Sequence, residues 1–357
     1  MPVARNLFVQ ANNLKHFIQS VLTGHGVPSP SARIVSDCLA LADLRGIDTH
    51  GINRLPSYLD QIKAGVLDPK AKPTVAQVTP VVAQVDCHNG LAYVAATQGI
   101  ERAIDMANSY GIGLVSVKHS SHLGMSAWVV QKALDAGMMS MVLTNASPTV
   151  PVWGGSVKLM GTSPIACGAP GGREKPFLMD MATTVATKGR ILKAPRNGEE
   201  IPDTWALDRK GNPTTDPEEA LKGGLRPIGD HKGSALAILM DLFAGVFTGS
   251  AFAGQVGSPD DVSKFSDIGH LFIVLKPDLF MPWEEYCKRA DHLYRTVVDS
   301  EPLDGVERIY YPGEREQLTY EERLRSGVPL TRMDIDKLNT YADAVGVERL
   351  VVSKRRE

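Results

Sequence analysis

Apolar residues recur every three to four positions near both ends of the chain. Residues 14–22 carry this helical spacing, and residues 34–42 repeat it before Gly46. The same spacing returns after Pro282 and again over residues 338–345. The pattern therefore predicts helices at both ends, and we expect these two groups of helices to pack together.

The middle of the chain carries strand patterns as well as helical ones. Val81, Ala83 and Val85 lie two residues apart, as in a half-buried strand, and run into the turn signal HNG. Further predicted strands lie at 111–119, 138–145, 164–170, 177–184 and 269–277, and predicted helices at 96–107, 126–137 and 232–248. This mixture favours a mixed α/β fold.

Residues 195–231 are rich in glycine, proline and charge, so we expect long loops there. One short helix is predicted among them, because Asp216 is a good N-cap, Pro217 suits the first helical position and Gly223 can end the helix.

We expect three parts: helices at 1–74, a mixed α/β cofactor-binding domain at 75–260, and a C-terminal part at 261–357 that packs back on the N-terminal helices.

Composition narrows the class of protein. The 38 basic and 40 acidic residues nearly cancel, so the charge balance does not favour nucleic acid. The four cysteines form no CxxC pair and there is no HExxH, so we expect neither a disulfide framework nor a metal site. The N-terminus lacks an apolar signal segment, and the apolar run at 235–247 is too short for a membrane span. We therefore expect a cytoplasmic protein with no membrane contact.

The common nucleotide-binding motifs are absent from the sequence. No GxGxxG follows a predicted strand, and there is no GxxxxGK[ST] and no GxSxG. A Rossmann domain or a P-loop is therefore not expected. If a dinucleotide binds to this chain, another backbone arrangement must hold its phosphates.

The segment DTHGINR at 48–54 is the first of four polar clusters. His50 and Arg54 are four residues apart, so a single helical turn would place both side chains on one face. A guanidinium binds a carboxylate through two parallel N–H groups, and an imidazole exchanges protons near neutral pH. The alternative interpretation is that Asp48 caps the turn and both side chains are exposed.

Each of the other clusters also has a functional and a structural interpretation. Residues 119–124 join a predicted strand to a helix, where backbone N–H groups can bind an anion or form an ordinary polar connection. Glycines and hydroxyls around Thr162 precede Asp180, which could cap the following helix, bond a ribose hydroxyl or orient a histidine. His231 and Lys232 open a predicted helix against its dipole, which favours either a bound anion or a solvated loop.

The order of these clusters resembles the malate/L-lactate dehydrogenase family, whose fold is unrelated to that of the Rossmann lactate and malate dehydrogenases. The matching motifs are collinear over about residues 40–315. They are ADLRGIDTHGINRLPSY (42–58), GIGLVSVKHSSHLGMS (111–126), the TN…P…WGG run (144–155), GTSPIA (161–166), MDMATT (179–184) with KGR (188–190), IPDTWALDRKGNPTTDP (201–217), GDHKG (229–233) and YPGE (311–314).

The resemblance implies a homodimer with a large, mainly antiparallel cofactor-binding sheet and a helical domain built from both chain ends. By similarity, His50 is the proton donor and acceptor, Arg54 holds the substrate carboxylate and Thr162 contacts the substrate. In the ureidoglycolate branch the histidine that matches His122 has the proton-transfer role, so two histidines compete for it. The residues that match cofactor-binding positions are His122, Leu123, Gly124, Met125, Ser126, Asp180, Met181, Ala182, His231, Lys232, Gly313 and Glu314.

The reaction that this resemblance implies is hydride transfer between NAD or NADP and a small 2-oxo or 2-hydroxy acid. The alternative is reduction of a cyclic imine-2-carboxylate, for which the matching branch uses a Ser–His–Asp relay. Thr49 keeps the hydroxyl of that catalytic relay, but its acidic position falls near Arg190, which makes imine reduction less favoured. A non-catalytic nucleotide-binding homologue would need a lost catalytic position, whereas His50, Arg54 and His122 are all present.

Overall fold

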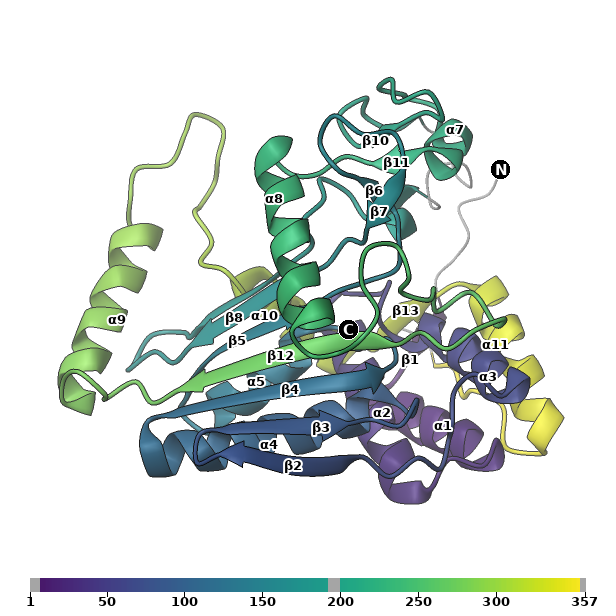
Figure 1. The fold of residues 1–357 in the computed structure, drawn as a ribbon, viewed down its shortest axis with the longest axis horizontal. Coiled ribbons are helices and arrows are strands. Elements are labelled where there is room, and N and C mark those ends of the chain that lie inside the picture. The colour runs from purple at the N-terminus through teal and green to yellow at the C-terminus, as the bar shows by residue number, and fades with distance from the viewer. Residues whose placement is uncertain (1–6, 192–199, 354–357) are drawn as a thin grey trace.

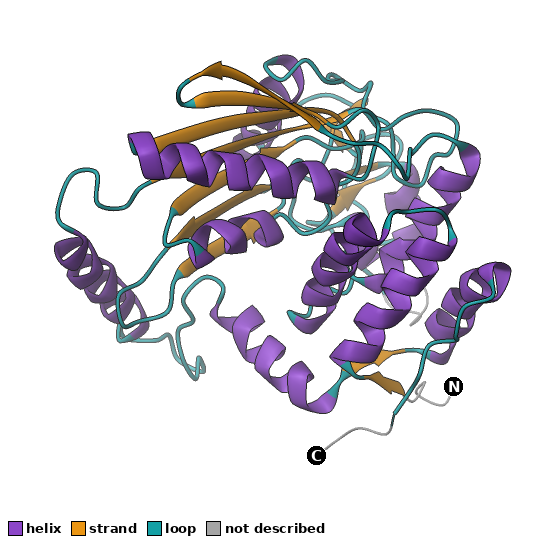
Figure 2. Cartoon of the chain, turned by 90° about the horizontal axis from the view of Figure 1, so that it is seen from below, coloured by secondary structure: helices purple, strands orange, loops and turns teal. Residues whose placement is uncertain are grey.

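The computed structural model describes residues 7–191 and 200–353. Helices from both ends of the chain form one packed group at one end of the molecule, as Figure 2 shows. Their common core joins Leu14 and Leu39 from the beginning of the chain with Val328 and Leu338 from its end. The helices of this group are α1 (Ala11–Gly24), α2 (Ser29–Leu44), α3 (Leu55–Ala64), α10 (Glu314–Ser326) and α11 (Arg332–Val345).

The two ends of the chain are also joined through their backbones. Strand β1 (Leu7–Val9) pairs antiparallel with β13 (Val328–Leu330), and the N–H of Ser353 donates to the carbonyl of Phe8 at 2.8 Å. Apolar residues bury the faces of these helices, which contributes more to their stability than helix propensity does. The expected helical domain built from both chain ends is therefore confirmed.

A seven-stranded sheet forms the middle of the molecule (Figure 1). Its strand order is β2-β3-β4-β12-β5-β8-β9, and only the β3–β4 pair is parallel. This mainly antiparallel pairing confirms the expected fold and differs from a Rossmann sheet, which is mostly parallel. The strands are β2 (Thr74–Thr79), β3 (Val82–Asp86), β4 (Ile112–Ser120), β5 (Met139–Thr144), β8 (Ile165–Ala169), β9 (Phe177–Met181) and β12 (Ile268–Leu275).

Helices cover the two faces of the sheet differently. Helices α4 (Ala92–Tyr110) and α5 (Ala127–Asp135) pack on one face. Helix α8 (His231–Met240) and its π-helical continuation (Asp241–Val246) lie on the other. Thus the expected helix at 232–248 forms, but its last part widens into a π-helix. Within the described residues, no helix is both long and apolar enough to span a membrane.

A small lobe with its own core lies above the sheet in Figure 1. The Asp216 carboxylate accepts hydrogen bonds from the N–H groups of Glu218 and Glu219, so the short helix predicted from Asp216, Pro217 and Gly223 is confirmed. Residues 195–199 of the predicted loop lie outside the described residues. The lobe contains β6 (Val150–Pro151), β7 (Lys158–Met160), β10 (Ala206–Leu207), β11 (Gly224–Leu225) and α7 (Pro217–Lys222).

The C-terminal part does more than pack on the N-terminal helices. Strand β12 inserts between β4 and β5, so the expected division at residue 261 cuts through the central sheet. Helix α9 (Trp283–Val298) extends away from the helical group, as both ribbon views show. The Asp291 carboxylate on α9 accepts hydrogen bonds from the N–H groups of residues 172–174, which fixes this helix to the turn between β8 and β9.

Candidate active site

A cavity of about 860 Å³ lies where the helical group meets the sheet. Its wall combines the chain after α2, the start of α5, strand β9 and the start of α10, which lie far apart in the sequence. Volumes of about 300–1,000 Å³ are usual for small-molecule sites. The lining includes Arg45, Asp48, Thr49, His50, Gly124, Met125, Thr162, Asp180, Ala182, Thr187, Arg190, Tyr310, Gly313, Arg315, Glu316 and Thr319.

The buried carboxyl group of Asp43 holds the loop that carries His50. The Asp43 side chain on α2 is fully buried, and its Oδ2 accepts a 2.7 Å hydrogen bond from the N–H of Ile52. Burial raises the pKa of Asp43 to about 8, so this carboxyl is mostly protonated at pH 7. Gly51 lies directly on it, because a Cβ at Gly51 would be 1.8 Å from Asp43 Oδ1.

His50 lies at the cavity wall with its ring held from one side. Its Nδ1 and Thr49 Oγ1 form a 2.9 Å hydrogen bond. Burial, together with the nearby Arg54 guanidinium, lowers the pKa of His50 to about 4. His50 is therefore neutral at neutral pH, with Nε2 as the ring nitrogen that the Thr49 hydrogen bond leaves free.

Arg54 lies behind Thr49 and is not part of the cavity lining. Its Nε donates to the Thr49 carbonyl at 2.8 Å. The expected single helical turn over 48–54 is not formed, because only Ile52–Arg54 are helical and His50 precedes them after a bend. The hydrogen bond from the Arg54 side chain to the Thr49 carbonyl, rather than helical spacing, holds the guanidinium beside Thr49 and His50.

The second histidine, His122, ends a chain of buried hydrogen bonds. Tyr93 Oη and Tyr58 Oη are 2.7 Å apart, and Tyr58 Oη is 2.8 Å from His122 Nδ1. Burial holds the pKa of both phenols well above their usual value, and it holds the pKa of His122 well below its own. The rings of His50 and His122 are stacked with centroids 5.5 Å apart.

The sequence reasoning missed Tyr58, Tyr93 and Asp43. Tyr58 had a weak signal, since it lies four residues after Arg54 in the same polar segment. No feature of the sequence pointed to Tyr93 or Asp43. Each lies within an apolar helical pattern, which does not reveal a hydrogen bond that forms in the folded interior. Gly124, which the sequence did single out, lies against this tyrosine, since a Cβ there would lie 2.3 Å from Tyr93 Oη.

Asp180 caps a helix, but not the one that the sequence suggested. Its Oδ2 accepts a 2.7 Å hydrogen bond from the N–H of Ala127, the first residue of α5, which precedes Asp180 in the chain. Burial raises the pKa of Asp180 to about 6, against the opposing effect of these N–H groups. Asp180 still lines the cavity, so a bound ligand can also reach the region of this carboxyl.

The structure brings together some of the expected cofactor positions. Gly124, Met125, Asp180, Ala182 and Gly313 line the cavity. Glu314 is buried instead and binds Arg308 and Lys175, which fixes the start of α10. His231 and Lys232 lie exposed at the start of α8. His122, Leu123, Ser126, Met181, His231, Lys232 and Glu314 do not belong to the lining.

The cavity has features that fit the phosphates of a dinucleotide. Helix α5 begins at Ala127 and α10 at Glu314, and residues at both of these N-termini line the cavity. The dipoles of helix N-termini attract anions, although the N–H groups of Ala127 and Trp128 already donate to Asp180 and to the carbonyl of Met125. Next to Ala127, the buried hydroxyl of Ser126 has no hydrogen-bond partner within the described protein.

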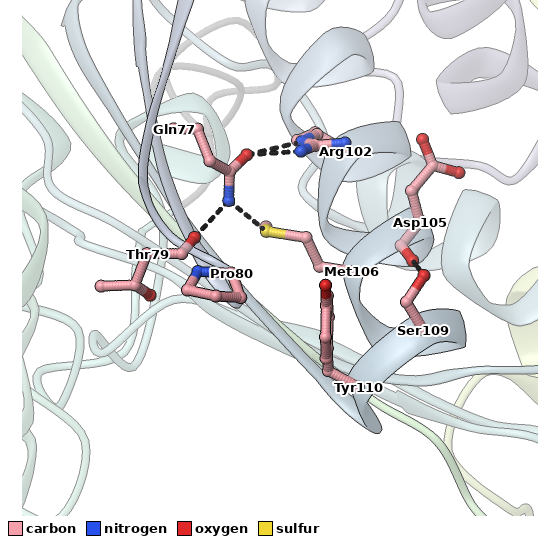
Figure 3. A pocket seen from close by; sticks show the side chains of 8 residues that line it. All are labelled: Gln77, Thr79, Pro80, Arg102, Asp105, Met106, Ser109 and Tyr110. Atoms are coloured by element: carbon pink, nitrogen blue, oxygen red, sulfur yellow. Dashed lines mark hydrogen bonds between the residues drawn. The ribbon is translucent and has the colours of Figure 1, made fainter.

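A second cavity of about 540 Å³ lies between the edge strand β2 and helix α4 (Figure 3). Its polar groups mostly bind one another. Gln77 Oε1 accepts from Arg102, while Gln77 Nε2 donates to the carbonyl of Thr79 and to Met106. Since no histidine lines it and these polar groups are already paired, we assign the chemistry to the larger cavity.

Comparison with known proteins agrees with this fold. Residues 9–339 match the family described as malate/L-lactate dehydrogenase. A malate dehydrogenase of Pyrococcus horikoshii is 37% identical over 350 residues, which cover 96% of each chain. An NADP(+)-dependent (2R)-3-sulfolactate dehydrogenase of Chromohalobacter salexigens is 33% identical, covering 90% of this chain and 94% of that protein.

A solved structure extends the likeness to the whole fold. The malate dehydrogenase from Entamoeba histolytica superimposes with a TM-score of 0.92 at 31% identity, covering 96% of this chain and 99% of that one. Family match, sequence identity and fold thus agree over nearly the full length. The chain belongs to the malate/L-lactate dehydrogenase family and is an NAD(P)-dependent oxidoreductase.

Proposed function

We propose that this enzyme interconverts 2-oxo and 2-hydroxy acids with His50 as the group that transfers the proton. The observation that carries the proposal is the position of His50 at the cavity wall, with Nδ1 bound to Thr49 and Arg54 held beside Thr49. An acid–base group next to a carboxylate-binding guanidinium is the arrangement that a 2-oxo acid requires.

In this mechanism Arg54 binds the substrate carboxylate through parallel N–H groups. The nicotinamide supplies or accepts the hydride at C2 when the cofactor is bound. His50 Nε2 exchanges the proton of the C2 oxygen, and Thr49 keeps the ring oriented through Nδ1. The cofactor phosphates would bind near residues 124–127 and Gly313, and Thr162 lines the same cavity for substrate contact.

His122 has a different role in this proposal. The raised pKa values keep Tyr93 and Tyr58 protonated, so Tyr93 can donate to Tyr58 and Tyr58 to His122 Nδ1. His122 then carries its proton on Nε2 and stays neutral, since its pKa is strongly lowered. We therefore assign His122 as a neutral hydrogen-bond donor and His50 as the proton carrier.

The charge around the site supports a 2-oxo acid rather than a cyclic imine. An imine is reduced as its protonated, cationic form, which an acidic side chain would stabilise. The carboxylates of Asp48, Asp180 and Glu316 also line the cavity, but Asp48 is bound to Arg323 and Asp180 to the N–H of Ala127. Arg190 lines the cavity near the position where the imine-reducing branch has its acidic relay residue, and Arg54 lies close to Thr49. Two guanidinium groups stabilise anions and oppose a cation.

The test of this function is an absorbance assay at 340 nm with the purified protein. NADH and NADPH are supplied separately, each with pyruvate, oxaloacetate, larger 2-oxo acids and preformed cyclic imino acids. We expect cofactor oxidation with at least one 2-oxo acid. Oxidation with cyclic imines alone would contradict the proposal, and cofactor binding without any turnover would favour a non-catalytic homologue.

Replacing Arg54 with alanine should raise KM for the 2-oxo acid by about 100-fold, with a smaller change in kcat. The reason is that the guanidinium contacts the substrate carboxylate and not the reacting atoms. Steady-state kinetics with the substrate found above would measure this. Arg289→Ala, which removes an exposed ion pair with Glu285 on α9, is the matched control. An unchanged KM in Arg54→Ala would refute the carboxylate role.

We also propose that the protein is a homodimer, because α8 and its π-helical continuation are apolar on both sides. One side packs on the sheet, and the other exposes a row of apolar side chains. A helix that is apolar all round is normally buried. We therefore assign a second copy of this chain as the occupant of this face. The row comprises Ile238, Leu239, Leu242, Phe243, Val246 and Phe247.

The double variant Leu242→Glu, Val246→Glu should therefore halve the mass of the protein in solution. Charges on this face would have to be desolvated in the contact between two copies. Light scattering coupled to gel filtration measures the mass. Met333→Glu places the same charge on an exposed apolar residue of α11 and should leave the dimer intact. A wild-type protein that elutes as a monomer would contradict the proposal.

The state of the cysteines supports a cytoplasmic location. All four are free thiols, and Cys38 and Cys87 are buried. Free, buried thiols are typical of proteins in a reducing compartment. We therefore propose that the enzyme acts in the cytoplasm.

A further inference from the structure

Helix α10 connects the loop of His50 with another part of the cavity wall. Towards the C-terminal end of this helix, Arg323 binds the carboxylate of Asp48, two residues before His50. Arg315 lines the cavity in the first turn of the same helix. At 1.5 Å per residue these two arginines are about 12 Å apart along the helix axis. A nicotinamide beside His50 would therefore leave the start of α10 to the other half of the dinucleotide.

Backbone N–H groups are free at the start of α10. Those of Arg315 and Glu316 have no hydrogen-bond acceptor within residues 7–191 and 200–353. At the start of α5, by contrast, the N–H groups of Ala127 and Trp128 already have acceptors. Free N–H groups and the helix dipole attract anions, so α10 offers the better of these two phosphate positions.

A buried guanidinium lies against the same helix start. Arg45, which follows α2, is only 6% exposed and lines the cavity. Its only side-chain hydrogen bond within the described residues is a long one, from Nη2 to the Gly313 carbonyl at 3.5 Å. Burial lowers the pKa of Arg45, although the charges of Glu316 and Asp180 act in the opposite direction. Buried charges are normally paired, and a bound phosphate would supply the partner that Arg45 lacks.

A second guanidinium, that of Arg315, lies exposed at the cavity wall beside Tyr310. The ring of Tyr310 contacts two arginines, with Arg308 Cζ 4.5 Å and Arg315 Cζ 5.8 Å from its centroid. Arg308 is bound to the carboxylate of Glu314. Arg315 has no carboxylate partner among the ion pairs of the described chain, so its N–H donors remain available to a ligand.

The acids that line the cavity do not cancel this charge. Asp48 is bound in an ion pair, and Asp180 accepts a backbone N–H. Glu316 is the other lining carboxylate, and its charge acts on Arg45. In dinucleotide sites a carboxylate suits the ribose 2′-hydroxyl of NAD, whereas an arginine suits the 2′-phosphate of NADP. Because Arg45 compensates Glu316, Arg315 is the charge that remains for an additional phosphate.

We propose that Arg315 is a specificity-determining residue that selects NADP(H) over NAD(H) by binding the 2′-phosphate, while Arg45 binds the phosphates that both cofactors share. This inference rests on the proposed function, which places the nicotinamide beside His50. A guanidinium donates two parallel, charge-assisted hydrogen bonds to a phosphate. Arg315 therefore adds affinity only for the cofactor that carries the additional phosphate.

Binding titrations of the full-length protein test this role without any 2-oxo acid. Isothermal titration calorimetry with NADPH and with NADH should give the lower Kd for NADPH. In Arg315→Gln the Kd for NADPH should rise about tenfold, and the Kd for NADH should change little. Competition by 2′,5′-ADP and by 5′-AMP locates the effect, because the variant should lose affinity for 2′,5′-ADP alone.

Three further variants separate this role from a structural one. Arg45→Lys keeps the charge but loses the planar fork, so it should weaken both cofactors alike. Glu316→Gln removes the nearby negative charge and should lower the Kd for NADPH. Arg325→Gln removes an exposed arginine at the other end of α10 and is the matched control, with both Kd values unchanged.

Tighter or equal binding of NADH by the wild type would overturn the role of Arg315, and so would an equal loss of both cofactors in Arg315→Gln. Weaker binding of NADH in Glu316→Gln, with no change for NADPH in Arg315→Gln, would assign the ribose to Glu316 instead. If the protein prefers NADPH as expected but turns over no 2-oxo acid, the proposed function fails and the role of Arg315 is retained.

Discussion

Replacing His50 with alanine should lower kcat by about 10²- to 10⁴-fold, the usual contribution of a positioned acid–base group. Cofactor affinity should change little, because the side-chain hydrogen bond of His50 is to Thr49. Turnover at saturating substrate measures the first effect, and quenching of protein fluorescence by NADH or NADPH measures the second. His16→Ala, on an exposed part of α1, is the matched control. Unimpaired turnover would end the assignment of His50.

The pH profile gives an independent check on the same residue. Oxidation of a hydroxy acid needs neutral His50 as the base, and burial lowers its pKa to about 4. The value of kcat/KM for oxidation should therefore be flat above about pH 5 and fall only as the pH approaches 4. For reduction, which needs protonated His50, kcat/KM should fall about tenfold per pH unit between pH 5 and 7. An inflection near the ordinary histidine pKa in either direction would contradict the uncharged state of His50.

Replacing Gly51 with alanine should have the second largest effect, on activity and stability together. The added Cβ would lie 1.8 Å from Asp43 Oδ1, so either Asp43 or the loop must move. Overpacking of this kind costs about 1–3 kcal/mol of unfolding free energy. The loop that moves carries His50 on one side and Arg54 on the other, so we expect kcat to fall and KM to rise. Thermal unfolding and steady-state kinetics of the variant measure the two effects.

The double variant Asp43→Ala, Gly51→Ala tests the reason for this effect. Truncating Asp43 makes room for the new Cβ, although the N–H of Ile52 then loses its acceptor. The two substitutions should therefore be strongly non-additive, with the double variant less impaired than the sum of the single ones. Additive losses would show that the contact between Gly51 and Asp43 does not control the loop.

The sequence predicts single elements of this fold well where the pattern is local. The apolar runs at 111–119 and 138–145 became β4 and β5, and the cap at Asp216 formed as predicted. Prediction failed where a partner from far along the chain decides the outcome. The sequence predicted the strand that became β12, but not its place between β4 and β5. The order of strands depends on pairing between distant segments, and the local hydrophobic pattern does not specify it.

The candidate site shows the same division between local pattern and distant contact. His50 and Arg54 were candidates because their polar segment contrasts with the apolar periodicity around it, and Thr162 was a candidate by resemblance to the family. The structure places His50 and Thr162 at the cavity wall and Arg54 beside Thr49. Asp180 was found too, but its cap on α5 was not, since Ala127 lies far before it in the chain. A hydrogen bond between distant residues involves only one atom of each residue. It therefore imposes no regular spacing of residue types along the chain.

By itself, the sequence determined that this protein mixes helices and strands, belongs to the malate/L-lactate dehydrogenase family and carries a histidine and an arginine in one loop. The mixture of elements and the polar loop follow from residue types and short-range spacing, whereas the family follows from the resemblance of its collinear motifs. Only the tertiary structure decided that Asp43 supports that loop, that Tyr93 and Tyr58 lead to His122, and that Arg45 reaches the start of α10. The physical reason is that burial and charge act through space, between groups that the folded chain brings together.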